Sequence, residues 1–414
     1  MRTKLLTGLL FIGTLLSCDS EKDTAPAPAP APEPAPIKTF DFSFRYDTHM
    51  EGAKDFELIL SQEDGKVVLD TLIAFNTDHK LRIKSGDTKY DLTTVLFNAP
   101  NNSYWVETYV QVNPDKWHLR YSMTSNTSPI EREKAEVTYT NIPNDKDMYF
   151  WSKGSTGYMA TWNAGTLKFA NYTRSLPTDL AYIILPNYGK YMFTELTSNK
   201  TTVDFTEAGN TGKRKYTKPA GITNFRTYLY GYTKEDEKTK QNLYSSLISL
   251  SNEYDLHFPP TGIEVYDLEV TYTDAGSYLH SYKYYGNQIP TEIDFAPTSD
   301  FSVSTSGFED FTVTFTDDKP SIYNMYWAAT DASFDARWNV YSSPEKSSFK
   351  PKAFLEGLKS KTLEGKNVSA FKLSYVRSQK MKDHSYQAIL DIMANPALSL
   401  YKEVKQSRII RKLF

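Results

Sequence analysis

Apolar and polar residues alternate at the start of the folded chain, and this alternation is typical of a β-strand with one buried face. Side chains two residues apart point to the same side of a sheet, so the apolar set faces a core and the polar set faces solvent. The pattern predicts a strand that begins near residue 40. Its members are Phe40, Phe42, Phe44 and Tyr46, with Asp41, Ser43 and Arg45 between them.

A β-hairpin is predicted after this strand. Apolar runs at 56–60 and 66–71 flank a polar segment that ends in Asp64-Gly65, and glycine adopts the positive φ that tight hairpin turns require. Further short apolar runs, separated by turn-prone polar stretches, predict strands along most of the chain. The clearest runs are 81–83, 90–97, 104–112, 117–122, 135–140, 148–151, 158–162, 166–172, 181–185, 191–196, 201–205, 225–232, 263–272, 278–285, 292–295 and 311–315.

One segment near the C-terminus departs from the strand pattern. Phe354, Leu355 and Leu358 recur at helical spacing after Pro351, and proline is favoured in the first turn of a helix. We therefore predict a short helix near 350–363. The final segment, 400–414, is compatible with either a helix or an edge strand.

Composition supports a mainly β fold. Aromatic residues make up 14% of the 414 residues and include 30 tyrosines, and aromatic and β-branched residues favour strands. The chain is longer than one core usually spans, so we predict two or three consecutive antiparallel β-sandwich-like domains. The predicted ranges are 1–17 for a signal peptide, 18–36 for an acylated cysteine and a stalk, 37–130 for a β-sandwich domain, 131–258 for a β-rich domain, and 259–414 for a β-rich domain with the short helix.

The first residues predict export and lipid anchoring. Arg2 and Lys4 precede an apolar run, 5–16, which is shorter than the roughly 20 residues of a membrane-crossing helix and matches the apolar region of a signal peptide. Leu15-Leu16-Ser17-Cys18 resembles the lipobox of bacterial lipoproteins. The resemblance implies cleavage before Cys18 and attachment of lipid to its thiol. A secreted protein with an unpaired thiol is the alternative.

The segment after the lipobox extends this resemblance. An acidic stretch, 19–23, is followed by a proline-rich stalk, 25–36, in which fixed φ angles favour an extended spacer. Together these features resemble surface lipoproteins of Bacteroidota, which implies a lipid-anchored protein of the outer membrane, exposed at the cell surface. Cys18 is the one cysteine of the chain, so its acylation leaves no thiol for a disulfide or a metal.

Charge and motif spacing narrow the classes of function. The net charge is −3, and a net charge this small and negative does not favour nucleic acid as a partner. The six histidines are scattered without the spacing of a helical zinc site. We therefore predict no catalytic residues, no metal site and no cofactor. A polysaccharide-degrading enzyme with a carboxylate pair and a structural component of an envelope assembly remain as alternatives.

The aromatic surplus gives the leading hypothesis, a non-catalytic binding or adhesion protein whose ligand is a glycan or a partner protein. Aromatic rings stack on the apolar faces of sugar rings without a catalytic group. Trp327 and Trp338 flank the polar segment 328–337, which has the composition of a loop. The alternative for each residue is a cross-strand pair in the core. The predicted ligand-binding residues are Tyr323, Tyr326, Trp327 and Trp338.

Overall fold

A computed structural model describes most of the chain after the predicted stalk. The described residues are 37–50, 54–63, 65–121, 131–155, 159–236, 239–245, 252–330 and 334–414. The predicted signal peptide (1–17), the lipid attachment at Cys18 and the stalk (18–36) lie outside the described residues. Residues Ile37–Phe414 form one compact unit, and its elements are mainly strands, which confirms the predicted fold class.

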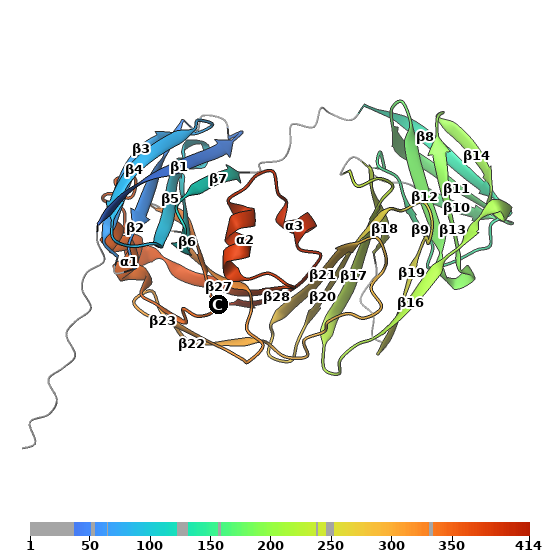
Figure 1. Cartoon of the computed structure of the whole chain (residues 1–414). Helices are drawn as coiled ribbons and strands as arrows, with labels where there is room; N and C mark the ends of the chain where they lie inside the picture. The colour runs from blue at the N-terminus through green and yellow to red at the C-terminus, as the bar shows by residue number, and fades with distance from the viewer. Residues whose placement is uncertain are drawn as a thin grey trace, which may run out of the picture. The chain divides into compact units, whose positions relative to one another are not determined.

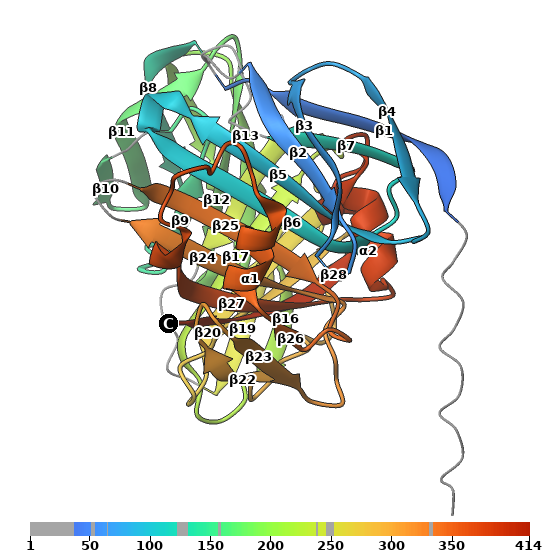
Figure 2. The ribbon, with the colours of Figure 1, turned by 90° about the vertical axis from the view of Figure 1, so that its left-hand side faces the viewer.

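The largest element of the fold is a twelve-stranded sheet (Figures 1 and 2). Its neighbouring strands are antiparallel except at one junction, where β25 and β6 run parallel. The strand order is β18 (Lys240–Ser245), β17 (Thr223–Tyr232), β20 (Val265–Thr273), β21 (Leu279–Gly286), β28 (Gln406–Leu413), β27 (Lys372–Met381), β24 (Ile322–Thr330), β25 (Asp335–Ser342), β6 (Ser103–Val112), β5 (Tyr90–Asn98), β2 (Asp55–Ser61) and β3 (Val67–Ala74).

This sheet takes strands from all three predicted folded ranges. The parallel junction joins β6, from the range 37–130, to β25, from the range 259–414. The boundaries at 130 and 258 stay predictions, but the three ranges do not each contain a separate set of sheets. The expected hairpin is confirmed, because β2 and β3 are antiparallel neighbours and Gly65 in their turn has a φ of +85°.

The C-terminal segment is neither wholly helical nor an edge strand. It forms the short helix α3 (Leu400–Glu403) and then β28, which lies between β21 and β27 in the interior of the sheet. Local periodicity does not reveal this place, because β28 is separated from β27 by two helices and from β21 by most of the C-terminal part of the chain. Helix α2 (Tyr386–Met393), which the sequence did not predict, lies beside α3 (Figure 1). The two helices share a small apolar cluster that includes Ile389 and Val404.

A three-stranded sheet packs against one end of the large sheet. It consists of β4 (His79–Ser85), β1 (Lys38–Thr48) and β7 (Lys116–Tyr121). Phe42, Phe44 and Tyr46 of β1 are buried against Leu58 and Leu92 of the large sheet. The alternation that starts the folded chain is therefore confirmed as a strand with one buried face.

Two four-stranded sheets enclose a separate core between residues 132 and 210. One sheet has the order β10 (Met159–Asn163), β11 (Thr166–Ser175), β8 (Arg132–Thr140) and β14 (Lys200–Asp204), and the other has β15 (Gly209–Asn210), β13 (Lys190–Leu196), β12 (Asp179–Leu185) and β9 (Tyr149–Trp151). Ile183 of β12 belongs to the core between these sheets, whereas Tyr182 packs with Leu268 of the large sheet. β12 is therefore buried on both faces.

The remaining elements are short. They are the strands β16 (Gly212–Thr217), β19 (Glu253–Phe258), β22 (Phe301–Ser306), β23 (Phe311–Phe315) and β26 (Ser348–Phe349), the helix α1 (Pro351–Leu358), and the 3-10 turns η1 (Ala99–Asn101), η2 (Pro186–Tyr188), η3 (Phe205–Glu207) and η5 (Val368–Ala370). The predicted helix near 350–363 is confirmed as α1, which ends where Lys359 adopts a φ of +50°. Leu355 and Leu358 form its buried face.

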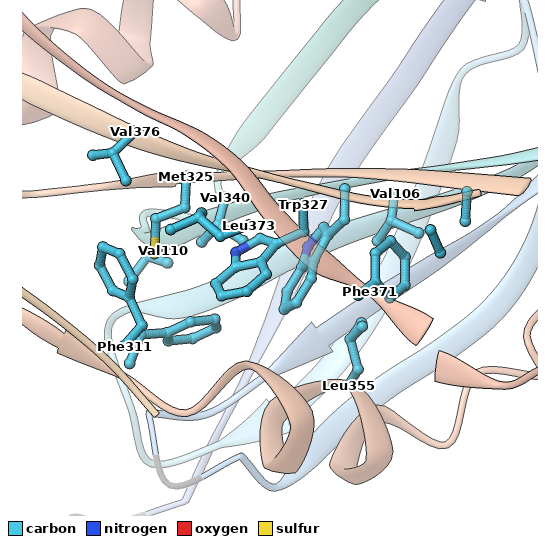
Figure 3. Packing of buried hydrophobic residues seen from close by; sticks show 14 of the residues in the cluster. Val106, Val110, Phe311, Met325, Trp327, Val340, Leu355, Phe371, Leu373 and Val376 are labelled. Carbon is cyan, nitrogen blue, oxygen red and sulfur yellow. The ribbon is translucent and has the colours of Figure 1, made fainter. Parts of the chain in front are cut away.

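The principal core lies between the centre of the large sheet and the layer formed by β22, β23, β26 and α1. Trp327 and Trp338, from neighbouring strands, are both completely buried there. Figure 3 shows Trp327 among Val340, Leu373 and Phe371, with Leu355 reaching the same cluster from α1.

Gly154 is sterically required in the turn after β9. Its N–H donates to Asp179 Oδ2 at 2.8 Å, and a Cβ at this position would overlap backbone atoms of Arg174 and Ser175. Since backbone atoms cannot move aside as a flexible side chain can, we expect Gly154→Ala to lower the free energy of unfolding by about 1–3 kcal/mol. Urea denaturation of Ile37–Phe414, followed by far-UV circular dichroism, measures this change.

Gly357 provides the matched control. It lies in α1, and a Cβ there would meet nothing within 4 Å. Gly357→Ala is expected to raise stability by about 0.5–1 kcal/mol, because alanine loses less backbone entropy in a helix. Equal denaturation midpoints for the two variants would contradict the steric account of Gly154.

Candidate functional site

The two faces of the large sheet differ in character. On β24, Met325 and Trp327 point into the principal core, whereas Tyr326 lies on the opposite face and is only half-buried. A row of residues in direct register lies on this opposite face. It consists of Tyr375 on β27, Tyr326 on β24, Asn339 on β25 and Glu107 on β6. We call this face the Tyr326 face, and its defining pairs are Tyr326↔Tyr375, Tyr326↔Asn339 and Asn339↔Glu107.

A pocket of about 200 Å³ lies on the Tyr326 face, where it meets the three-stranded sheet. Strands β5, β6, β24 and β25 supply most of its walls, and Tyr46 of β1 adds one side. We call it the Tyr326 pocket. Its lining residues are Tyr46, Thr94, Leu96, Trp105, Val106, Glu107, Tyr326, Arg337 and Asn339.

Tyr326 is held in place by a second tyrosine. Its ring stacks on that of Tyr375, with a centroid distance of 4.8 Å and an angle of 9° between the ring planes. The guanidinium of Arg411 lies 5.7 Å from the centre of the Tyr375 ring, where a cation is attracted to the ring face. Stacking restricts the Tyr326 side chain before any ligand arrives, and this preorganisation reduces the entropy cost of binding.

Glu107 places a carboxyl group beside these rings. Desolvation by the surrounding strands raises the pKa of Glu107, although the hydroxyl of Tyr109, 3.2 Å from Glu107 Oε2, donates a hydrogen bond that opposes this rise. Tyr109 itself stacks on Tyr341 at 5.1 Å. The carboxyl group is therefore fixed in position by a side chain whose own ring is packed.

Asn339 is oriented by a hydrogen-bonded chain beside the pocket, on the same face of the sheet. Asn324, completely buried, donates from Nδ2 to Asn339 Oδ1 at 3.3 Å, and Asn324 Oδ1 accepts from Arg377 Nε at 2.7 Å. Asn339 lines the pocket, and its amide nitrogen carries two N–H groups that can donate to a ligand. The exposed Arg337 lies two residues before Asn339 on the same face of β25, and it adds a cation at the rim of the pocket.

Only one of the four predicted ligand-binding residues lines this pocket. Tyr326 does, but Tyr323, Trp327 and Trp338 are completely buried in the principal core, so the prediction that they contact a ligand is wrong. The segment 328–337 is not one long loop, because β24 runs to Thr330 and β25 begins at Asp335. Trp327 and Trp338 are consequently paired directly across two antiparallel strands, on the core side.

Sequence reasoning missed Trp105, Glu107, Arg337 and Asn339. A signal for the first two was present, because the segment 104–112 predicts a strand and residues 105 and 107 share one face of it. No local signal joins that segment to Arg337 and Asn339, since β6 and β25 are distant in the chain and run parallel.

The site shows no metal cage and no carboxylate pair. Within the described residues, no group of three or more histidine, cysteine, aspartate or glutamate side chains is placed to hold a metal ion. Glu107 is the one acid among the described residues that line the Tyr326 pocket. In the same part of the chain, no helix has the length and apolar character needed to cross a membrane.

Comparison of the chain with protein-family models and with curated protein sequences finds no match. An aromatic ring held flat by stacking, a desolvated carboxyl group, an oriented amide and a guanidinium converge in the Tyr326 pocket from adjacent strands. Such a combination binds a molecule that has both an apolar face and several hydroxyl groups.

Proposed function

We propose that this protein is a lipid-anchored, cell-surface binding protein that takes up a glycan in the Tyr326 pocket. The observation that carries the proposal is the convergence of the stacked Tyr326 ring with Glu107 and Asn339 in one pocket. A sugar ring has an apolar face of C–H groups and an equatorial rim of hydroxyls, and this pocket offers a complement to each.

In the bound state, the ligand's apolar face stacks on Tyr326. Its hydroxyl groups donate to the Glu107 carboxyl group and accept from the Asn339 amide. Because both polar groups are held by neighbours, little side-chain freedom is lost on binding. This arrangement binds without bond cleavage, which is consistent with a non-catalytic role.

The proposal includes the lipid anchor at Cys18. Lipid on Cys18 would hold the protein at the outer membrane, since two or more acyl chains give stable attachment. The proline-rich segment 25–36 would act as a semi-rigid spacer between the lipid and the folded unit. The glycan pocket would then work at the cell surface, at a distance from the lipid headgroups.

Removal of the Tyr326 ring tests the proposal. In a glycan array and in calorimetric titration of Ile37–Phe414 with the best-bound glycan, we expect Tyr326→Ala to weaken binding about tenfold, which corresponds to about 1.4 kcal/mol of lost contact. Tyr326 is half-buried at a pocket rather than in the core, so the variant is expected to fold.

Tyr188→Ala is the matched control. This tyrosine is 51% exposed in η2, within the region 132–210, and it lines no part of the Tyr326 pocket. The control should bind as the unmodified protein does. Equal affinity of the two variants, or failure of the unmodified protein to retain any glycan, would refute the proposed site.

A further inference from the structure

Among the described residues, four arginines of the Tyr326 face form no ion pair with an acidic side chain. Among the described residues, the arginine ion pairs belong to Arg45, Arg82, Arg174 and Arg408. None of these four lies on the Tyr326 face. The arginines that do lie there come from β17, β25, β27 and β28, and they are Arg226, Arg337, Arg377 and Arg411.

Two of these arginines place like charges opposite each other on neighbouring strands. Arg377 and Arg411 are direct register partners on β27 and β28, and like charges opposite each other on antiparallel strands are unfavourable. Arg377 is fixed by its hydrogen bond to Asn324 Oδ1, and Arg411 is fixed over the Tyr375 ring. An arrangement of this kind is relieved when an anion binds between the guanidinium groups.

A second hollow, of about 520 Å³, lies next to this pair on the same face. Arg226, Arg377 and Arg411 line it together with Lys283. Glu269 is its one acid among the described lining residues, and it is engaged by Ser281 at 2.9 Å and by Lys283 at 3.6 Å. The hollow therefore has an excess of positive charge.

The Tyr326 pocket and this second hollow form one path across the sheet. Arg337 on β25, Tyr326 on β24, Tyr375 on β27 and Arg411 on β28 belong to four consecutive strands. Neighbouring strands are about 4.8 Å apart and residues along a strand rise about 3.3 Å. Arg337 is in register with Ala328 and Arg411 with Asn324, so the path crosses three strand spacings and four residue steps and is roughly 20 Å long. Two acids lie near the Arg337 end of this path. One is Glu107, whose pKa is raised by desolvation, and the other is Asp335, which lies on the same strand face as Arg337.

We propose that the ligand of this face is an acidic polysaccharide, which binds along the path from Arg337 to Arg411. Its sugar rings stack on Tyr326, and its carboxylate or sulfate groups pair with Arg337, Arg377 and Arg411. Guanidinium groups suit these anions because they donate two parallel hydrogen bonds to one planar or tetrahedral anion. This inference rests on the proposed glycan-binding function and specifies its ligand class.

A polysaccharide fits this face better than an acidic protein segment does. The Tyr326 ring lies between the cations Arg337 and Arg411, and the Tyr375 ring, which contacts Tyr326 and Arg411, supports it. A charged polysaccharide presents both sugar-ring faces and anions, which match an aromatic ring flanked by cations. An acidic peptide such as poly-glutamate offers anions but no ring face to stack on Tyr326.

Binding to matched polymers tests the inference. Ile37–Phe414, which contains every described element, is titrated with dextran sulfate, polygalacturonate, unmodified dextran and poly-glutamate, and is applied to an array of neutral and acidic glycans. We expect acidic glycans to bind and the affinity to fall when NaCl is raised from about 50 to 200 mM, because salt screens charge pairs. Arg411→Gln is expected to weaken acidic binding about tenfold.

Arg132→Gln is the matched control, because Arg132 is an exposed arginine on β8, away from this face. It removes the same charge and should leave binding unchanged. Binding of neutral glycans that depends on Tyr326 but not on Arg411 would overturn the acidic ligand while leaving the proposed function intact. Stronger binding of poly-glutamate than of any acidic glycan would also overturn it. Retention of no glycan would overturn both proposals.

Discussion

Replacement of Trp338 by alanine is expected to lower the free energy of unfolding by about 3–5 kcal/mol, the range for loss of a large aromatic side chain from a core. Trp338 is completely buried. Its ring stacks on Phe354 of α1 at 5.9 Å, and its Nε1–H donates to Thr108 Oγ1 at 3.0 Å. The substitution leaves a cavity and removes one of the two hydrogen bonds of Thr108 Oγ1, which keeps Thr93 Oγ1 as a partner at 3.0 Å. Urea denaturation followed by far-UV circular dichroism gives the change.

Trp338→Phe separates the two contributions. It keeps most of the packing and removes the hydrogen bond to Thr108, so we expect a smaller loss of about 1–3 kcal/mol. The sequence alone placed Trp338 in a ligand site. If Trp338→Ala unfolded at the same urea concentration as the unmodified protein but lost glycan binding, the core assignment would be wrong and the earlier prediction right.

Glu57→Ala is expected to have an effect of similar size, about 3–5 kcal/mol. Glu57 on β2 is completely buried, and its carboxylate accepts from Ser360 Oγ at 2.5 Å, Lys361 N at 2.7 Å and Thr362 N at 3.0 Å. These bonds attach the segment after α1 to the large sheet. Alanine would leave the buried donors unsatisfied, and each such group costs about 1–3 kcal/mol. The same denaturation experiment measures the loss.

The contribution of Glu57 also depends on pH. Desolvation raises the pKa of Glu57. The hydrogen bonds from Ser360, Thr362 and Lys361 together lower this pKa by more than desolvation raises it, so the pKa in the folded protein lies below the ordinary value of 4.5. A carboxyl group with a depressed pKa stabilises the fold above its unfolded pKa, and this stability is lost as the pH falls through the folded value.

Denaturation midpoints at pH 7, 5, 4 and 3 test this dependence. We expect the unmodified protein to lose stability below about pH 4.5, and Glu57→Gln, which cannot titrate, to lose less over the same interval. Parallel curves for the two proteins would show that Glu57 does not supply the pH dependence.

The local pattern of the sequence was sufficient to predict strands but not their partners. The alternation from Phe40 to Tyr46 identified β1, and helical spacing after Pro351 identified α1. By contrast, the contact between Glu57 and Ser360 joins positions 303 residues apart. Nothing in either segment specifies the other, because strand pairing over such distances is determined by the packing of the whole sheet.

The candidate site shows the same limit. The residues near 323–338 were recognised as important, but the face that each occupies depends on where the strands begin and end. Once β24 is extended to Thr330, the period of two places Trp327 in the core and Tyr326 on the opposite face. Glu107 joins Tyr326 only through the parallel pairing of β6 with β25, which local periodicity does not encode.

A crystal structure of Ile37–Phe414 with the best-bound oligosaccharide would show whether the Tyr326 pocket is the binding site. We expect a sugar ring stacked on Tyr326, with hydroxyl groups within hydrogen-bonding distance of Glu107 and Asn339. An oligosaccharide bound elsewhere on the protein, with no contact to the Tyr326 pocket, would contradict this expectation.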